Sequence, residues 1–296
     1  MNKMVEGKAI GEKEPMEDAG KMVDLNDSPL GKRIESLSAY DPSILFPIPR
    51  KPMREELGIM GSNPFFGMDF WNGYELSWLN LRGKPQVGIL RFSVSSDSKN
   101  IVESKSLKLY LSGFSQHRIE KEDLVPLISK DLSDAFDAFV MVTIIQPDEF
   151  DQLKIEEMDG LLLDRLDIST DIYAPAPELL RSNMEEAPVE EVLVSHLLKT
   201  NCPVTGQPDW ATLQIHYAGP QIDQERLLKY IISLRTAQAF HEQCVERIWL
   251  DIKHYCRPPH LSVYARYTRR GGIDINPWRT NFSTRRHPQV ARTARQ

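Results

Sequence analysis

The order of the expected secondary-structure elements constrains the fold of this chain more than any other feature, because that order occurs twice. In the first half, hydrophobic periodicity predicts strand, strand, helix, helix and strand at residues 74–81, 86–94, 100–114, 122–136 and 139–146. The second half gives the same order at residues 191–200, 210–218, 222–240, 241–255 and 261–268, although the spacing of the first of these also permits a helix. The repeat predicts an α+β protein of two tandem, similar domains, with antiparallel sheets that are each covered by helices on one face.

The division of the chain follows from this repeat and from local composition. A length of 296 residues suits about two domains. Residues 1–35 are polar and weakly periodic, which predicts a flexible N-terminal extension. The proline-rich and aromatic segments 40–50 and 63–71 favour an extended, packed arm over a helix. We therefore expect a first domain, a linker (APAPELLRSNMEEAP) and a second domain at residues 36–173, 174–188 and 189–296.

Composition argues against a membrane-spanning or a secreted, disulfide-bonded protein. The chain is 41% hydrophobic and 26% charged, as expected of a globular protein. It has no apolar run of about 18 residues, so no transmembrane helix is expected. The first twenty residues lack the apolar segment of a secretory signal. Three cysteines without close spacing argue against a disulfide framework and favour the cytoplasm.

Charge is unevenly distributed along the chain. The net charge is −6, yet residues 257–296 contain nine arginines and one acid, Asp274. Such a basic end could face an anion such as a phosphate, a cofactor or RNA. The alternative is that these arginines form a solvated tail whose positive charge only balances the acidic remainder of the chain. This alternative explains the last ten residues better than it explains Arg269 and Arg270.

A short loop in the second half combines a thiol with an acid. The segment TNCPVTGQPDW (residues 200–210) places Cys202 and Asp209 between two predicted strands, where the first half has only the turn RGKP. Loops on rigid sheets often carry reactive groups. A cysteine thiolate attacks electrophiles, and a nearby carboxyl can protonate the atom that becomes negative. The alternative is a small buried thiol beside a turn-forming Asp, with Trp210 as a wedge in the loop.

A second cluster lies where the two second-half helices meet. There His241 and Glu242 are adjacent and could orient a polar ligand and move a proton, or could simply form a solvated helix start. The spacing of His241 and Cys244 also permits a metal pair, with Cys202 as a third ligand. Cys244 and Cys256 have an ordinary explanation as packing residues.

A third cluster, Glu103-Ser104-Lys105-Ser106, lies at the expected start of a first-half helix. A carboxylate, two hydroxyls and an ammonium group meet there at a helix N-terminus, which is a favourable place for an anion. The alternative is a capping arrangement with exposed charge.

Four separate blocks together resemble one family. They are VESKSLKLY (102–110), CPVTGQPDW (202–210), FHEQC (240–244) and YARYTRRGGIDINPWR (264–279). The blocks resemble, in the family's own order, those of QueF, the NADPH-dependent 7-cyano-7-deazaguanine reductases of queuosine biosynthesis. The resemblance runs from about residue 35 to the C-terminus. Because the ESKS motif and the Cys loop lie in different halves, it implies the long form with two tandem tunnelling-fold (T-fold) domains, assembled as a homodimer.

The resemblance also implies a role for each matching residue. Cys202 would add to the nitrile carbon to form a covalent thioimide, Asp209 would protonate the nitrile nitrogen, and His241 would assist proton transfer. The substrate-binding residues would be Glu103, Ser104, Lys105, His241 and Glu242. The residues that hold NADPH, two of which are consumed in each turnover, would be Lys105, Ser106, Arg270 and Gly271.

The residues themselves agree with these roles only in part. A guanine-like base presents N–H donors that Glu103 or Glu242 could accept, and a buried carboxylate discriminates against bases that lack them. Arginines beside a Gly-Gly turn suit the additional phosphate of NADPH. The chain has no G-x-G-x-x-G segment, so no Rossmann domain is expected, and the nicotinamide cofactor follows from the resemblance alone.

Two other classes of function stay open at this stage. The first is a zinc hydrolase on the same fold, like the pterin-forming cyclohydrolases, with Cys202, His241 and Cys244 as ligands. The second is a non-catalytic RNA- or nucleotide-binding module that uses the basic C-terminal end. With the QueF assignment we expect a small-molecule substrate, and neither a structural metal, a membrane nor a stable nucleic-acid partner.

Overall fold

The computed structural model describes residues 39–283, 288 and 291–296. The predicted extension over residues 1–35 lies outside this part of the chain. The first half contains β2 (Phe66–Leu79), β3 (Pro85–Ser95), α2 (Ser104–Gly113), α3 (Lys121–Phe136) and β5 (Val140–Ile145). The second half contains β8 (Val189–Asn201), β9 (Pro208–Gly219), α4 (Gln224–Ser233), α5 (His241–Tyr255) and β11 (His260–Tyr267). Both halves therefore show the expected order, and residues 191–200 form a strand.

The repeat extends to local irregularities that element order alone does not reveal. The pairing of β2 with β3 shifts register between Gly73 and Leu76, and that of β8 with β9 shifts between Ser195 and Leu198. In both halves an acid caps the first helix, because the side chains of Glu103 and Asp223 accept hydrogen bonds from N–H groups in the first turns of α2 and α4. The two halves are thus built on one local plan.

The two expected sheets are joined into a single sheet by a strand that the sequence did not predict. β12 (Ile273–Thr280) pairs with β11 on one side and with β2 on the other. The strand order of the eight-stranded sheet is β5-β3-β2-β12-β11-β9-β8-β6, and β6 (Leu161–Leu162) is its one parallel member. Both faces of β12 are buried, so its residues show no polar–apolar alternation, and Pro277 argues further against a strand.

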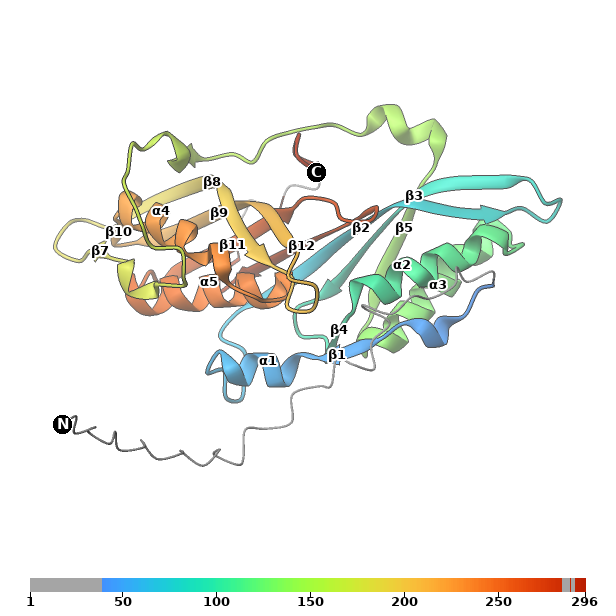
Figure 1. Ribbon diagram of the computed structural model, residues 1–296, viewed down its shortest axis with the longest axis horizontal. Helices are drawn as coiled ribbons and strands as arrows, with labels where there is room; N and C mark the ends of the chain where they lie inside the picture. The colour runs from blue at the N-terminus through green and yellow to red at the C-terminus, as the bar shows by residue number, and fades with distance from the viewer. Residues whose placement is uncertain (1–38, 284–287, 289–290) are drawn as a thin grey trace, which may run out of the picture.

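The helices lie against this sheet as two pairs (Figure 1). α2 and α3 pack on the first-half strands in a core that includes Trp71, Leu107 and Phe136. α4 and α5 pack on the second-half strands in a separate core that includes Leu213 and Trp249. The α+β class, with an antiparallel sheet under helices, is confirmed. No helix in the described ranges has the length and apolar character needed to cross a membrane.

The segment before β2 is only partly the extended arm that we expected. It contains β1 (Pro47–Pro49), which pairs with β4 (Asn100–Val102), but also the helix α1 (Arg50–Glu56), which was not predicted. Pro52 lies in the first turn of α1, where proline is tolerated. The strand β2 begins at Phe66, so the aromatic run that we assigned to the arm is mostly sheet.

This segment reaches the other half of the molecule. Ile59 and Phe65 belong to the second-half core, where the Phe65 ring meets Trp249 edge-on at 5.4 Å between centroids. The first half is thus anchored to α5, the helix that begins with His241.

A second short pairing, of β7 (Ser182–Asn183) with β10 (Gln221–Ile222), fixes the chain that enters β8.

Candidate active site

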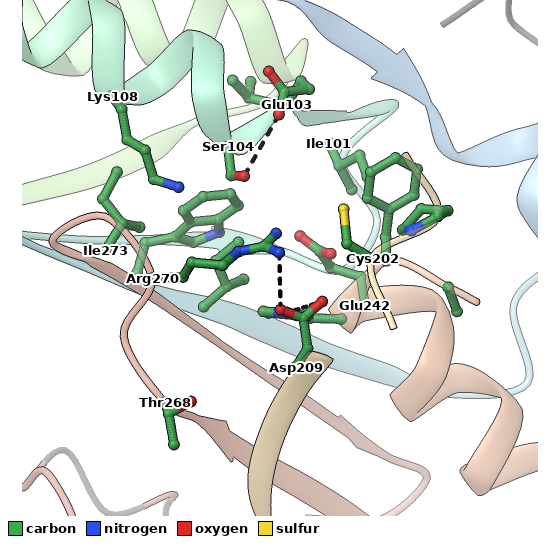
Figure 2. A pocket seen from close by; sticks show the side chains of 17 residues that line it. Ile101, Glu103, Ser104, Lys108, Cys202, Asp209, Glu242, Thr268, Arg270 and Ile273 are labelled. Atoms are coloured by element: carbon green, nitrogen blue, oxygen red, sulfur yellow. Dashed lines mark hydrogen bonds and ion pairs between the residues drawn. The ribbon is translucent and has the colours of Figure 1, made fainter. Parts of the chain in front are cut away.

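A pocket lies where the two halves meet (Figure 2). Its walls come from the β4–α2 junction, the loop between β8 and β9, the start of α5 and the turn between β11 and β12. Seven predicted site residues line it: Glu103, Ser104, Cys202, Asp209, His241, Glu242 and Arg270.

The Cys loop (residues 202–207) closes the β8–β9 hairpin with a tight turn. The Cys202 carbonyl accepts a hydrogen bond from Gly206 N–H at 3.0 Å, and Cys202 N–H donates to the Gln207 carbonyl at 2.9 Å. Gly206 has φ of +67°, a conformation that favours glycine. The turn brings the backbone of Val204 and Thr205 back beside the Cys202 sulfur.

This turn changes the acidity of the Cys202 thiol. Burial raises the pKa of Cys202, but hydrogen bonds from the Thr205 hydroxyl and N–H, together with those from Arg270 and Val204, outweigh burial and bring the pKa below its ordinary value. Burial instead raises the pKa of Cys244 to about 11 and that of Cys256 to about 12. Because the thiolate is the nucleophilic form, Cys202 is the cysteine suited to covalent chemistry.

Asp209 is held between a potential proton donor and a fixed cation. Its Oδ2 lies 3.4 Å from His241 Nε2, and its Oδ1 lies 3.4 Å from Arg270 Nη1. The His241 ring stacks on Tyr267, with centroids 3.7 Å apart and planes at 3°. The other ring nitrogen of His241 is buried and has no hydrogen-bond partner within the described ranges. This arrangement can pass a proton between His241 and Asp209.

Glu242 is a buried carboxyl that faces the pocket beside Cys202 (Figure 2). Its residue is 3% exposed. Its own backbone N–H donates a hydrogen bond to the carboxylate, but no side chain in the described part of the chain does so. Burial and the negative charge of Asp69 raise the pKa of Glu242, while Arg50 and His241 oppose the rise. Since each carboxylate oxygen can accept more than one hydrogen bond, this buried carboxyl is suited to a ligand that brings N–H donors.

Glu103 caps a helix and also lines the pocket. Its carboxylate accepts hydrogen bonds from Lys105 N–H at 2.7 Å and from Ser106 N–H at 2.8 Å. The Ser104 hydroxyl lies 3.5 Å from Glu103 Oε1. The capping half of the alternative reading is therefore correct, but the Glu103 charge is buried and not exposed. Capping does not exclude contact with a ligand, since each carboxylate oxygen can accept more than one hydrogen bond.

Lys108 and Arg270 both line the pocket and are here called its cationic wall (Figure 2). Burial and the neighbouring Arg270 lower the pKa of Lys108, and no carboxylate in the described ranges forms an ion pair with it. Gly271, at φ of +63°, lets the β11–β12 turn approach this lysine, because a Cβ there would lie 3.0 Å from Lys108 Cε. Two such cations suit an anionic group such as a phosphate.

Comparison with known proteins matches both halves of the chain. The model "Nitrile reductase, 7-cyano-7-deazaguanine-reductase N-term" matches residues 37–144, and the model "QueF-like protein" matches residues 208–286. The NADPH-dependent 7-cyano-7-deazaguanine reductases of Burkholderia ambifaria (strain MC40-6) and Burkholderia multivorans are each 59% identical over 270 residues, which is 91% of this chain and 98% of each relative. The chain belongs to the QueF family.

One further relative and one solved structure also match this chain. The enzyme of the same name from Burkholderia vietnamiensis is 58% identical over the same share of both chains. A crystal structure of the archaeosine synthase QueF-Like in the apo form matches 34% of this chain and 99% of its own length, with 16% identity and a TM-score of 0.29.

Three residues that the QueF resemblance assigned to ligand binding do not line the pocket: Lys105, Ser106 and Gly271. The Ser106 hydroxyl is buried, donates to the Glu103 carbonyl at 2.6 Å and accepts from Phe46 N–H at 3.0 Å. The sequence interpretation missed Lys108, which lies one helical turn after Ser104 and so shares its face of α2. The i, i+4 spacing within the ESKSLK segment was the signal that could have found it.

The zinc hydrolase alternative requires a set of metal ligands. Within the described ranges, no group of three or more His, Cys, Asp or Glu side chains is arranged to hold a metal ion. Cys244 instead lies buried in the second-half core.

Several arginines of the basic end have partners within the chain. The Arg269 guanidinium lies 4.2 Å from the centroid of the Tyr74 ring, and Arg279 forms ion pairs with Asp69 and Glu246. Arg295 donates a hydrogen bond to the His196 carbonyl at 2.7 Å. These arginines are therefore not a solvated tail, whereas Arg285 and Arg286 lie outside the described residues.

Proposed function

We propose that this chain is an NADPH-dependent nitrile reductase that converts 7-cyano-7-deazaguanine (preQ0) to 7-aminomethyl-7-deazaguanine (preQ1) in queuosine biosynthesis. The observation that carries the proposal is one pocket in which a thiol of lowered pKa, Cys202, lies beside the buried carboxyl of Glu242. The names of the Burkholderia relatives support the same activity and cofactor.

Recognition of the base rests on the two buried glutamates. Glu242 accepts hydrogen bonds from the N–H donors of the guanine-like edge, in addition to the one from its own backbone. Glu103 and Ser104 contact the base from the α2 side of the pocket. A base without those N–H groups would bury the Glu242 carboxylate with too few donors, so the site rejects it.

The covalent step uses Cys202 as nucleophile and Asp209 as proton carrier. The Cys202 sulfur forms a bond to the nitrile carbon, and the carbon–nitrogen triple bond becomes a double bond. The proton that leaves the thiol passes through the Asp209 carboxyl to the nitrogen, so the product is a neutral thioimide and no atom is lost. His241, 3.4 Å from Asp209, returns a proton to Asp209 for the later steps.

The residues of the cationic wall fit NADPH. Lys108 and Arg270 offer positive charge to its phosphates, and Gly271 leaves room that a Cβ would fill. The resemblance adds Lys105 and Ser106, from the first turn of α2, to the residues that hold the cofactor. Bound there, NADPH would supply hydride, and two molecules are needed because nitrile to amine is a four-electron reduction.

The chain assists the reduction in three ways. Cys202 departs as a thiolate when the carbon–sulfur bond breaks, and its lowered pKa makes it a better leaving group. Asp209 and His241 supply protons to the nitrogen. Trp71 and Phe240 line the pocket with aromatic rings that exclude water, which would hydrolyse an imine.

Turnover with defined components tests the proposal. The protein is mixed with preQ0 and NADPH, while nicotinamide oxidation and product mass are followed together. We expect two NADPH oxidised for each preQ1, unchanged rates in a chelator, and no turnover by Cys202→Ala, with Cys244→Ala and Cys256→Ala as matched controls. A folded wild-type protein that oxidises no NADPH would refute the proposal, and loss of activity in the chelator would favour the zinc enzyme.

The proposal also covers the oligomeric state, the cellular location and the domain boundaries of the chain. We infer a cytoplasmic homodimer without a stable nucleic-acid partner, since all three cysteines are free and the outer edge of β5 presents Phe139 and Met141 at 79% and 60% exposure. We retain the division into residues 36–173, 174–188 and 189–296. Sedimentation at twice the 33.9 kDa chain mass, together with proteolytic cleavage within the linker, tests both.

A further inference from the structure

Behind the pocket lies a buried group of five charged side chains, here called the arginine cluster: Arg50, Arg54, Asp69, Glu246 and Arg279. Arg50 Nη2 lies 2.5 Å from Asp69 Oδ2, and Arg279 Nη1 lies 2.7 Å from Asp69 Oδ1. Arg54 Nη2 and Arg279 Nη2 lie 2.8 and 2.9 Å from Glu246 Oε1. The cluster therefore ties α1, β2, α5 and β12 together.

The arginine cluster carries an unbalanced charge. It contains three guanidinium groups but only two carboxylates, which leaves one positive charge in a buried place. Each of the five residues is at most 8% exposed, so water compensates little of that charge. Buried charge without a partner is costly. A third carboxylate near the cluster would make it neutral.

Glu242 lies close enough for the charges of Asp69 and Arg50 to act on it, although it forms no ion pair with a cluster arginine in the described ranges. It lies one turn before Glu246 on α5, so the two side chains share a face of the helix. On β2, Asp69 and Trp71 point to the same side of the sheet because they are two residues apart, and Trp71 lines the pocket with Glu242. Glu242 thus lies between the arginine cluster and the space for the ligand.

Resting on the proposed function, we propose that Arg50 and Asp69 are positioning residues for the substrate base, because their ion pair controls whether Glu242 is an ionised acceptor. Burial raises the pKa of Glu242 most; the charge of Asp69 raises it further, and the charge of Arg50 lowers it. The other titratable or charged groups around Glu242 are His241 on α5 and, across the pocket, Glu103, Lys108, Cys202, Asp209 and Arg270.

The charges of Arg50 and Asp69 should shift the pH dependence of affinity for the base in opposite directions. An ionised Glu242 accepts hydrogen bonds from the base, so affinity is lost as pH falls through the Glu242 pKa. Arg50→Gln removes the charge that lowers this pKa, and the loss of affinity should move to higher pH. Asp69→Asn removes a charge that raises it, and the loss should move to lower pH. A purely structural role would weaken both variants without moving the two profiles in opposite directions.

The experiment measures Kd for preQ0 by calorimetry across pH in a Cys202→Ala background, where no covalent adduct contributes. We expect the midpoints of Arg50→Gln and Asp69→Asn to differ by about one pH unit, which is roughly tenfold in Kd on the acid side. The double variant should have an intermediate midpoint. Arg54→Gln is the matched control, since Arg54 contacts Glu246 on the same cluster and should move the midpoint less than Arg50→Gln.

Each outcome separates this inference from the proposed function. No binding of preQ0 by the folded Cys202→Ala protein at any pH would overturn the proposed function itself. Binding with coincident midpoints in the two single variants would overturn only the role of Arg50 and Asp69. An equal shift in Arg54→Gln would do the same. If one single variant fails to fold, the other is compared with the Cys202→Ala protein alone, and a midpoint that does not move would refute the inference.

Discussion

Replacing Thr205 by valine tests whether the Cys loop tunes its thiol. The Thr205 hydroxyl donates a hydrogen bond to Cys202 and lowers the pKa of that thiol, while the Thr205 N–H and Arg270 bonds would remain in the variant. A hydrogen bond to a charged group contributes about 1.5–3 kcal/mol, and one pKa unit corresponds to about 1.4 kcal/mol. Because Thr205 is exposed, water screens this bond, so we take the lower end and expect the Cys202 pKa to rise by about one unit.

The assay is the rate of covalent adduct formation with preQ0 across pH, followed by rapid quench and intact mass. The thiolate is the attacking form, so the rate rises through the Cys202 pKa and levels above it. Thr205→Val should move this rise to higher pH by about one unit, with rates about tenfold slower below both midpoints and equal rates above them.

Serine at the same position is the control, because Thr205→Ser keeps the hydroxyl and should keep the wild-type profile. Superimposed profiles for wild-type protein and Thr205→Val would show that the hydroxyl does not set the acidity of Cys202. A serine variant that shifts as far as valine would point to loop packing instead.

Further substitutions divide the roles among the site residues. Asp209→Asn should leave the Kd for preQ0 unchanged in calorimetry but slow adduct formation; formation at the wild-type rate would remove Asp209 from proton transfer. Glu103→Ala should weaken binding of the base and lower the melting temperature, since loss of a helix cap costs about 1 kcal/mol; an unchanged Kd would assign recognition to Glu242 or to backbone. Lys108→Met should raise the KM for NADPH in steady-state kinetics more than Lys105→Met does, and the reverse order would return the phosphate contact to Lys105.

The sequence predicted the order of the larger elements because their periodicity is strong. It failed where burial removed that periodicity. β12 is covered on both faces and contains Pro277, so it shows neither alternation nor a favourable composition, yet it joins the two halves. α1 was missed because prolines surround it and because its buried residues, Arg50 and Arg54, are charged. Charged residues at i, i+4 indicate a buried helix face only once their carboxylate partners are known.

The sequence motifs predicted part of the candidate site. Cys202, Asp209, His241 and Glu242 meet in one pocket as the family blocks implied. Which residues at the start of α2 face the pocket was harder to predict, because a motif does not show which side of a helix faces the ligand. The arginine cluster was not accessible at all, since Asp69 and Arg279 become neighbours only through the pairing of β2 with β12.

The most direct test of the account is intact-mass spectrometry after the protein is mixed with preQ0 in the absence of NADPH. We predict one adduct per chain with the full mass of preQ0, because thioimide formation loses no atom. The adduct should be absent in Cys202→Ala, present in Cys244→Ala, and discharged when NADPH is added. A folded, reduced protein that gains no mass, or an adduct that survives in Cys202→Ala, would contradict the assignment of Cys202 as the nucleophile.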